Sequence, residues 1–383
     1  MSDLVLIVVL VAAACGAHWL RRDLRTIPVG GGRRGDARAV SVVIPARNEE
    51  GTLPVLLESL RRLSTGVREV IVVDDDSQDS TASVARSAGA RVLSPGAPPR
   101  GWTGKAWACH CGARASSGDL LLFLDADTVL APDALAGLLE LHDRHGGLVS
   151  VQPFHTVLRA YEQLSAYFNV VSLLASGAFA RRPARRSMAF GPCLLTSRTD
   201  YQRAGGHAVV RGEILDDAAL AAAYLRAGPP VRCAVGGRSV RMRSYPGGIR
   251  QLAAGWTKNV ASGASAAAPG PTVATVLWVC AHHAVAVGAA SSLAAGATGW
   301  TVPSTGHPAL WAVAWVGLAC QLRSILRRAG SFRWWTWALF PVPLLAFDVI
   351  FALSAVLTVV RRSVRWRDRE VEVRRHASAQ ERA

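Results

Sequence analysis

Two groups of carboxylates could bind a cation or a set of hydrogen-bond donors. Three carboxylates are adjacent at positions 74 to 76, and two more flank Ala126. Adjacent carboxylates repel one another and are destabilising unless a cation or donors offset their charge. Two carboxylates separated by one residue at the end of a strand can reach the same hard cation. The residues concerned are Asp74, Asp75, Asp76, Asp125 and Asp127.

A third acidic pair, Asp216 and Asp217, opens an alanine-rich, helix-like stretch. Helix capping and the helix dipole alone favour acids at this position. The same position also suits a carboxylate that accepts a proton during a reaction. A polar loop follows the first predicted strand and by itself indicates a turn into a helix. Its residues are Pro45, Ala46, Arg47, Asn48 and Glu49.

Two further polar residues have both a structural and a functional interpretation. Lys105 precedes a helix-like stretch, and Lys258 is the other lysine of the chain. A lysine at a helix start is usually solvated, but the scarcity of lysine in this chain favours a contact of Lys105 with phosphate or sugar. His207 follows two glycines, which fits a structural turn and a ligand contact equally well.

The segments that must position these side chains alternate between strands and helices from residue 40 to about residue 151. Short apolar runs at 41–44, 70–73, 91–93, 120–124 and 148–151 have the length of buried strands. This order predicts an α/β fold, with a Rossmann-like, mostly parallel sheet covered by helices. The carboxylates at 74–76 and at 125 and 127 then follow the carboxyl ends of strands, where such sheets bind ligands.

Apolar stretches at both ends of the chain predict attachment to a membrane. Residues 4–20 are about as long as a bilayer core is thick. Arg21 and Arg22 follow, so we expect a retained anchor whose arginine side faces the cytoplasm. Residues 272–293 and 309–325 predict two more spans. Residues 334–360 are interrupted by Pro341 and Pro343, and we expect a re-entrant or interfacial hairpin there.

These patterns divide the chain into an N-terminal anchor at 1–25, a linker at 26–39 and an α/β domain at 40–260. Within the domain, residues 156–186 fit either a core helix or a helix lying on the membrane surface, because arginines follow the apolar part. A C-terminal membrane region at 271–360 and a basic cytoplasmic tail at 361–383 complete the predicted organisation.

The composition excludes several classes of protein. The chain has 383 residues, of which 50% are hydrophobic, and a formal net charge of +16. It is therefore neither a disordered protein nor a small disulfide-stapled module. A basic excess beside apolar spans follows from the positive-inside rule, and no nucleic-acid-binding motif is present, so we expect no nucleic-acid partner. Cys109 and Cys111 lack a second ligand pair at zinc spacing and are expected to be buried thiols.

Four segments resemble, in their order and spacing, family-2 glycosyltransferases of the GT-A fold. They are SVVIPARNEE, EVIVVDDDSQDST, GDLLLFLDADT and EILDDAALAAAYLRAG. A narrower resemblance is to membrane-bound carotenoid glycosyltransferases of the diaponeurosporenoate type and to hopanoid-associated transferases. It rests on PPRGWTGKAWAC, AFGPCLLTSRTDY, AGGHAVVRGEILDD, GGIRQLAAGWTKN and RRSVRWR.

The resemblance implies a role for each cluster. The loop at 45–49 and the acids at 74–76 would hold the nucleotide. Asp125, with Ala126 beside it, would face the donor sugar or the ribose, and Lys105 would contact a phosphate or the sugar. Asp127 would bind Mg²⁺ or Mn²⁺, which neutralises charge on the leaving nucleoside diphosphate. Asp217, with Asp216 beside it, would be the catalytic base as the anomeric carbon inverts.

One departure from the family bears on the product. Processive relatives carry Gln-x-x-Arg-Trp, whereas the matching segment here runs from Gln251 to Trp256, is one residue longer and lacks the arginine. We therefore expect transfer of a single sugar. Trp256 could still stack on an acceptor. The residues expected near the acceptor or the diphosphate are His207, Arg211, Gln251, Trp256 and Lys258.

The sequence thus predicts an inverting, metal-dependent transferase. It would move one sugar from a nucleotide sugar such as UDP-glucose to a membrane lipid such as a carotenoid, at the cytoplasmic face of the bacterial inner (plasma) membrane. A transferase acting on polyprenyl phosphate or another lipid is the alternative, and an inactive membrane scaffold is a third possibility. An alcohol acceptor needs Asp217 as a base, whereas a carotenoid carboxylate is already ionised at neutral pH. We expect Asp217 to be required.

Overall fold

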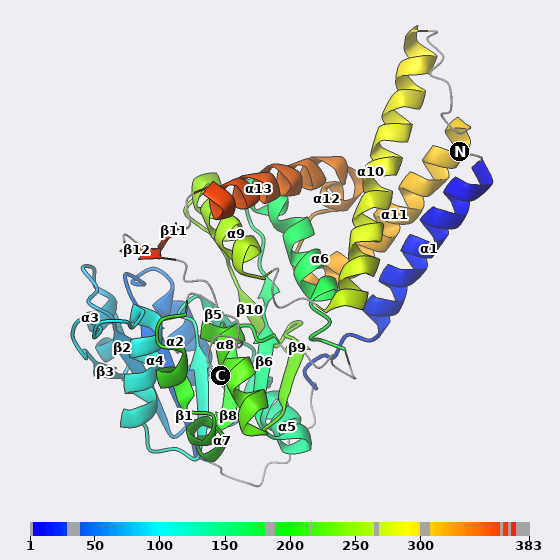
Figure 1. Cartoon of the computed structure of the whole chain (residues 1–383). Helices are drawn as coiled ribbons and strands as arrows, with labels where there is room; N and C mark the ends of the chain where they lie inside the picture. The colour runs from blue at the N-terminus through cyan, green and yellow to red at the C-terminus, as the bar shows by residue number, and fades with distance from the viewer. Residues whose placement is uncertain are drawn as a thin grey trace, which may run out of the picture.

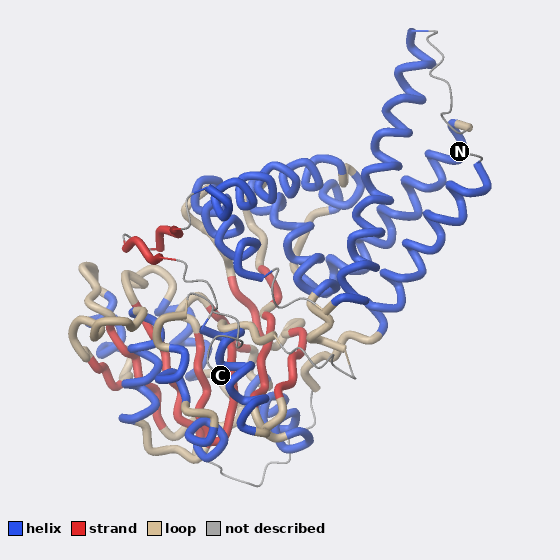
Figure 2. The backbone as a smooth tube through the Cα atoms, in the orientation of Figure 1, coloured by secondary structure: helices blue, strands red, loops and turns tan. Residues whose placement is uncertain are grey.

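An α/β domain and a group of long helices make up the protein, as its computed structural model shows (Figures 1 and 2). The structure describes residues 3–28, 39–180, 188–213, 216–263, 268–298, 307–360, 363–366 and 369–372. In Figure 1 the sheet lies at the lower left and the long helices extend toward the upper right.

A seven-stranded sheet carries the acidic residues. Its order is β3-β2-β1-β4-β8-β6-β9. Neighbouring strands pair in parallel except at β8, which is antiparallel to both β4 and β6. The predicted α/β fold with a mostly parallel sheet is confirmed. The strands are β1 (Val40–Ala46), β2 (Glu69–Asp74), β3 (Arg91–Leu93), β4 (Leu120–Leu124), β6 (Leu148–Gln152), β8 (Cys193–Ser197) and β9 (Val231–Val235).

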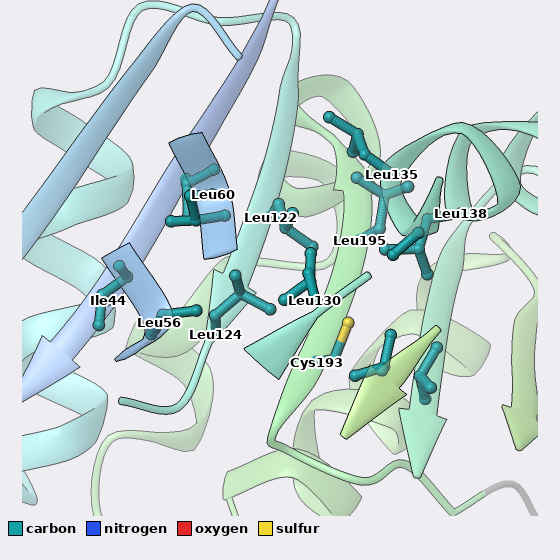
Figure 3. Close-up of a cluster of buried hydrophobic side chains, with 14 of the residues drawn as sticks. Ile44, Leu56, Leu60, Leu122, Leu124, Leu130, Leu135, Leu138, Cys193 and Leu195 are labelled. Carbon is teal, nitrogen blue, oxygen red and sulfur yellow. The ribbon is translucent and has the colours of Figure 1, made fainter. Parts of the chain in front are cut away.

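Helices cover both faces of this sheet, which explains its long apolar runs. Every residue of β4 is buried, as expected for a strand between two helical layers. Leu122 and Leu124 pack with α2 and α5 (Figure 3), whereas Leu121 and Phe123 point to the opposite face and pack with α4 and α8. The helices of the domain are α2 (Leu53–Arg61), α3 (Thr81–Ser87), α4 (Gly104–Ala115), α5 (Ala134–His145), α7 (Arg198–Arg203), the 3-10 helix η2 (Gly206–Val210) and α8 (Asp216–Ala227).

A small sheet, ordered β5-β10-β7, continues from the end of β4. β5 (Thr128–Leu130) begins directly after Asp127 and pairs antiparallel with β10 (Val240–Met242), so that Thr128 lies opposite Met242. β7 (Phe154–His155) pairs with the other side of β10. The chain beyond Met242 therefore runs past Asp127 on its way to α9 (Ile249–Gly263).

Three helices are long and apolar enough to cross a membrane, among the residues that the structure describes. They are α1 (Asp3–Arg22), α10 (Pro269–Thr298) and α11 (Pro308–Ala329), and they pack side by side (Figure 1). They correspond to the predicted spans at 4–20, 272–293 and 309–325. Large apolar side chains on their outer faces are exposed, for example Val276 and Val313.

The interrupted segment at 334–360 forms two helices, α12 (Trp334–Ala338) and α13 (Pro341–Val360). The expected hairpin does not form within α13, because both prolines fall in its first turn, where a missing N–H breaks no helical hydrogen bond. α13 lies at a steep angle to α10 (Figure 1) and packs on α9 and α6. The part of the basic tail that is described forms a hairpin of β11 (Ser363–Trp366) and β12 (Arg369–Glu372).

Residues 156–180 form the 3-10 helix η1 (Tyr161–Ser165) followed by α6 (Ala166–Ala175). α6 is buried on most of its surface and packs against α10, α11 and α13. Of the two possibilities left by the sequence, this placement is that of a core helix. Residues 181–187, which include the arginines of the predicted interfacial segment, lie outside the described residues.

Part of the chain between α1 and β1 pairs with the end of the edge strand β9 and is therefore not a free linker. The N–H of Arg25 donates to the carbonyl of Phe179, and its carbonyl accepts from the N–H of Val235, both at 2.8 Å. Ile27 is buried in the core of the domain. These contacts attach α1 to the α/β domain before the chain reaches residues 29–38, which lie outside the described part.

Candidate active site

The carboxyl ends of β1, β2 and β4 bring the predicted residues to one edge of the sheet. Ala46 pairs with Asp74 and Val43 pairs with Phe123. The loops that follow these three strands therefore leave the sheet at neighbouring points. Open α/β sheets bind ligands at this edge.

The loops at 45–50 and 74–81 are tied to each other by hydrogen bonds. Arg47 Nη1 donates to the carbonyl of Asp75 at 2.6 Å, and the N–H of Asn48 donates to Ser77 Oγ at 3.0 Å. Asn48 and Asp76 have φ angles of 54° and 60°, in the left-handed region that Asn and Asp tolerate better than most residues. The two predicted nucleotide-binding segments thus form one fixed polar surface.

Asp75 is buried where this surface meets α4. It is 8% exposed, and its Oδ2 lies 3.9 Å from Arg47 Nη1. Gly104 begins α4 against the same carboxylate, and any side chain there would overlap Asp75. A larger residue at position 104 would therefore displace the Asp75 carboxylate from its place in the loop.

Lys105 lies beside the carboxylate that ends β4. Its Nζ is 2.7 Å from Asp125 Oδ1. Thr103 caps α4 by accepting from the N–H of Ala106 at 3.3 Å, which fixes the turn that carries Lys105. Burial opposes the ammonium charge, but the carboxylates of Asp125 and Asp216 outweigh it and hold the pKa of Lys105 above its ordinary value. Lys105 is therefore charged and offsets part of the negative charge at this edge.

Asp217 is held by backbone groups at the start of α8. Its Oδ2 accepts from the N–H of Gly191 and its Oδ1 from the N–H of Ala218, each at 2.8 Å. A Cβ on Gly191 would lie 3.2 Å from Lys105 Nζ and 3.4 Å from Asp217 Oδ2, so the glycine leaves the space between them open. Burial and then the charge of Asp216 raise the pKa of Asp217 to about 6. Such a carboxylate is mostly ionised at neutral pH and is a better base than an exposed one.

Asp127 lies where a cation would relieve repulsion between carboxylates. Burial and then the charges of Asp125 and Glu49 raise the pKa of Asp127 to about 7. Within the described residues, no three His, Cys, Asp or Glu side chains converge as metal ligands. Magnesium in nucleotide sites is commonly held by one or two carboxylates together with substrate phosphates. The carboxylates at the end of β4 fit a divalent cation bound in that way.

A cavity of about 10 Å³ lies between Lys105, Asp125 and Asp217. His207, which is 2% exposed, reaches the cavity from η2. Burial lowers the pKa of His207 to about 4, so its ring is neutral at pH 7. The polar residues that line the cavity are Lys105, Asp125, His207, Asp216 and Asp217, and Pro45 of the first loop lines it as well.

Trp256 lies away from this cavity, on the buried side of α9. It is 6% exposed and stacks on Phe168 with ring centroids 4.8 Å apart. Its indole N–H donates to Ser165 Oγ at 3.0 Å, and Tyr245 packs edge-on against it. The sequence had suggested that this ring could stack on an acceptor. In the structure Phe168 of α6 covers its face, so the ring joins α9 to α6 instead.

Two other predicted acceptor contacts, Gln251 and Arg211, do not line the cavity. Gln251 Oε1 accepts from the N–H of Gly247 at 2.7 Å, which stabilises the turn before α9. Arg211 is exposed, and its carbonyl accepts from the N–H of Thr103 at 2.7 Å. The side chain of Lys258 lies outside the described residues.

Sequence reasoning missed three residues of this region: Gly191, Tyr201 and Tyr245. Gly191 and Tyr201 contact cavity residues from distant parts of the chain, and no local pattern marks them. Tyr245 has a φ of 59°, and its hydroxyl accepts from Asn259 Nδ2 at 3.2 Å. Burial and then the charge of Asp127 raise its pKa, so it lies near the predicted metal ligand. The Pro-Gly-Gly run after Tyr245 is a turn signal that could have pointed to it.

Comparisons with known proteins show the family to which the chain belongs. Residues 41–184 match the family described as glycosyl transferase family 2. A 4,4'-diaponeurosporenoate glycosyltransferase of Staphylococcus aureus (strain MRSA252) is 32% identical over 383 residues, which cover 97% of this chain and 98% of that protein. The protein of the same name from Staphylococcus haemolyticus (strain JCSC1435) is 38% identical over 255 residues, or 64% of this chain and 68% of that protein.

A solved structure shares the fold. It is a mannosyltransferase from Pyrobaculum calidifontis in complex with GDP-Man and Mn²⁺, with a TM-score of 0.52 and 21% identity, covering 91% of this chain and 98% of that one. The fold, with carboxylates at the end of a central strand, is that of a GT-A glycosyltransferase. This chain belongs to glycosyl transferase family 2, and the resemblance found in the sequence is confirmed.

Proposed function

We propose that this glycosyltransferase moves a single sugar from a nucleoside diphosphate sugar to a polyene lipid of the carotenoid type. The observation that carries the proposal is the placement of Asp217 beside Lys105 and Asp125, with an open space between them at the ligand-binding edge of the sheet. The class of acceptor is taken from the relatives named as 4,4'-diaponeurosporenoate glycosyltransferases.

The nucleoside part of the donor would bind the surface formed by the loops at 45–50 and 74–81. Asp75 is buried there beside Arg47, so it can accept hydrogen bonds from the N–H of a base or from ribose hydroxyls without competition from water. UDP-glucose is the donor we expect. The sugar would then extend toward Asp125 and Lys105 at the end of β4.

Asp127, with Asp125 nearby, would hold Mg²⁺ or Mn²⁺, which neutralises charge on the departing nucleoside diphosphate. Lys105 and Arg47 supply the protein's own positive charge at this edge. The raised pKa of Asp127, caused first by burial and then by its acidic neighbours, supports a cation at this place.

In the transfer step, an oxygen of the acceptor forms a bond to the anomeric carbon from the face opposite the diphosphate. The bond from that carbon to the diphosphate oxygen breaks, and its electron pair leaves with the nucleoside diphosphate, so the anomeric carbon inverts. A hydroxyl acceptor passes its proton to Asp217, which is fixed by the N–H groups of Gly191 and Ala218. A carboxylate acceptor has no proton to lose. We propose Asp217 as a required base.

The α/β domain would lie at the cytoplasmic face of a bacterial plasma membrane. α1 and α11 carry arginines in the turns from which the chain passes back toward the domain, at Arg21, Arg22, Arg327 and Arg328. Arginines of this kind favour the cytoplasmic side. α13 would lie along the membrane surface, with its buried side on α9 and its apolar outer side in lipid.

The test is a panel of radiolabelled nucleotide sugars incubated with the purified full chain in nanodiscs that contain extracted carotenoid acids, carotenoid alcohols or polyprenyl phosphate. Label in a carotenoid product, with a nucleoside diphosphate released in equal amount, is the expected result. Label in polyprenyl phosphate would replace the proposed acceptor. No labelled lipid with any donor would contradict the proposal.

A further inference from the structure

Tyr201 and His207 are joined by two hydrogen bonds inside the domain. The backbone N–H of His207 donates to the Tyr201 hydroxyl at 3.0 Å, and the same hydroxyl lies 2.8 Å from His207 Nδ1. Tyr201 is 7% exposed and His207 is 2% exposed. The pair is therefore shielded from water.

The position of the protons follows from these contacts. The hydroxyl of Tyr201 has one proton to donate, and within the described residues its hydrogen-bond partners are the backbone N–H and Nδ1 of His207. A proton on Nδ1 would leave the buried hydroxyl proton without an acceptor, which is unfavourable. Tyr201 therefore donates to Nδ1, and the ring proton of the neutral His207 resides on Nε2.

The local sequence makes this arrangement possible. A Cβ at position 206 would lie 2.5 Å from Tyr201 Cε1 and 2.9 Å from its hydroxyl oxygen, so a glycine is needed for the two side chains to meet. The ring centroid of Phe123 lies 5.0 Å from that of His207 and 5.5 Å from that of Tyr201. Phe123 belongs to the strand that leads to Asp125, so the pair is fixed relative to the active site.

With Nδ1 held by Tyr201, Nε2–H is the donor that His207 offers to the cavity that it lines. A volume of about 10 Å³ is close to the space of one water-sized oxygen. The lining contains two donors, Lys105 and His207, and three carboxylates. A hydroxyl oxygen can accept from the donors and give its proton to a carboxylate, whereas a carboxylate or phosphate oxygen would be repelled by the three acids.

We propose that this cavity receives one hydroxyl group of the transferred sugar, that His207 Nε2–H donates to its oxygen, and that Tyr201 is the positioning residue that keeps the proton on Nε2. The inference rests on the proposed function, since it requires a nucleotide-sugar donor. It adds selection among sugars by His207 of η2 and Tyr201 of α7, two residues that belong to neither of the loops proposed to hold the nucleotide.

The experiment compares kcat/KM for the donor that the panel identifies, UDP-glucose in the expected case, with kcat/KM for each of its monodeoxy analogues. The wild-type full chain in nanodiscs should lose about 10- to 100-fold with one analogue, the range for one lost hydrogen bond in a buried site. Tyr201→Phe should reduce that one loss to about threefold or less and leave the losses with the other analogues unchanged. A general structural defect would change all analogues alike.

Tyr224→Phe is the matched control. It also removes a buried tyrosine hydroxyl, which shares a 2.8 Å hydrogen bond with Thr196, but Tyr224 does not line the cavity. This variant should keep the wild-type pattern of losses. If Tyr201→Phe does not fold, His207→Gln and His207→Leu replace it, because glutamine keeps an N–H near the position of Nε2 and leucine does not. Gln should then retain the selective loss and Leu should abolish it.

The outcomes separate the two proposals. Wild-type transfer with no selective loss for any analogue, or a selective loss that persists undiminished in Tyr201→Phe or His207→Leu, overturns this inference and leaves the proposed function standing. Absence of turnover with every nucleotide sugar contradicts the proposed function, and this inference with it.

Discussion

Lys105→Met removes the ammonium that lies 2.7 Å from Asp125 and keeps a side chain of similar length. The carboxylates that line the cavity, Asp125, Asp216 and Asp217, then lack the positive charge that offsets their mutual repulsion. In the wild-type protein the charge of Lys105 lowers the pKa of Asp217, although burial and Asp216 together still raise it to about 6. We therefore expect the pKa of Asp217 to rise further in the variant.

The size of the effect follows from the contact. A hydrogen bond to a charged group contributes about 1.5–3 kcal/mol, which corresponds to about a 10- to 150-fold loss in kcat/KM at roughly 1.4 kcal/mol per factor of ten. The pH dependence adds to this. Asp217 acts as a base in its ionised form, so activity is lost as the pH falls through its pKa, and a higher pKa moves that loss toward neutral pH. Lys105→Arg keeps the charge and should return the acid limb toward its wild-type position.

The assay is kcat/KM for the nucleotide sugar between about pH 5 and pH 9, with the lipid acceptor saturating. Arg62→Met is the control, because it also removes one cation from an ion pair, with Glu58 at 2.8 Å, but Arg62 is exposed and such pairs contribute little. An acid limb at the same pH in Lys105→Met and the wild type, with kcat/KM within about threefold, would refute the role assigned to Lys105.

Three other predictions follow from the same structure. Asp127→Asn should lower transfer by orders of magnitude, as should excess chelator acting on the wild type, whereas full turnover with chelator present would rule out the metal. Transfer to a hydroxyl-bearing acceptor should fall as the pH drops below about 6, the pKa of Asp217. The turnover of Asp217→Asn should be about 10²–10⁴-fold lower than that of the wild type. Near-wild-type turnover by this variant would reject Asp217 as the base and favour a carboxylate acceptor. Spin labels at Val342 and Val356, both exposed on the outer side of α13, should report the same depth in the bilayer, because a helix crossing the membrane would separate them by about 20 Å.

The strand ends of the site could be predicted because buried strands leave a strong local signal. Residues 120–124 are a continuous apolar run followed directly by Asp125, and the same holds for the run that ends at Asp74. Parallel pairing then places such ends at one edge without further information. The carboxylates at 74–76 and at 125 and 127 were identified in this way. Lys105 was singled out because lysine is scarce in the chain, and it does meet Asp125 at that edge.

β8 was not predicted because its pattern is weak. It is a five-residue strand between two helical connections, and it enters the sheet antiparallel to both neighbours. Its insertion brings Gly191, just before the strand, next to Asp217, which lies 26 residues further along the chain. Contacts at such separations depend on the completed sheet, and no local periodicity encodes them.

The packing of Trp256 shows the same limit. An aromatic residue on an amphipathic helix can face a ligand or the protein core, and the sequence pattern is identical in the two cases. The direction is decided by Phe168 and Ser165, which belong to another segment. The pair of Tyr201 and His207 was likewise hidden, although its two glycines marked a turn.

The most direct test of the account is the anomeric configuration and mass of the lipid product made by the purified full chain from UDP-α-glucose, determined by NMR and mass spectrometry. The account predicts one hexose per polyene, linked in the β configuration, because a direct displacement inverts the anomeric carbon. A product with the α configuration, or one that carries a chain of hexoses, would contradict single inverting transfer at Asp217.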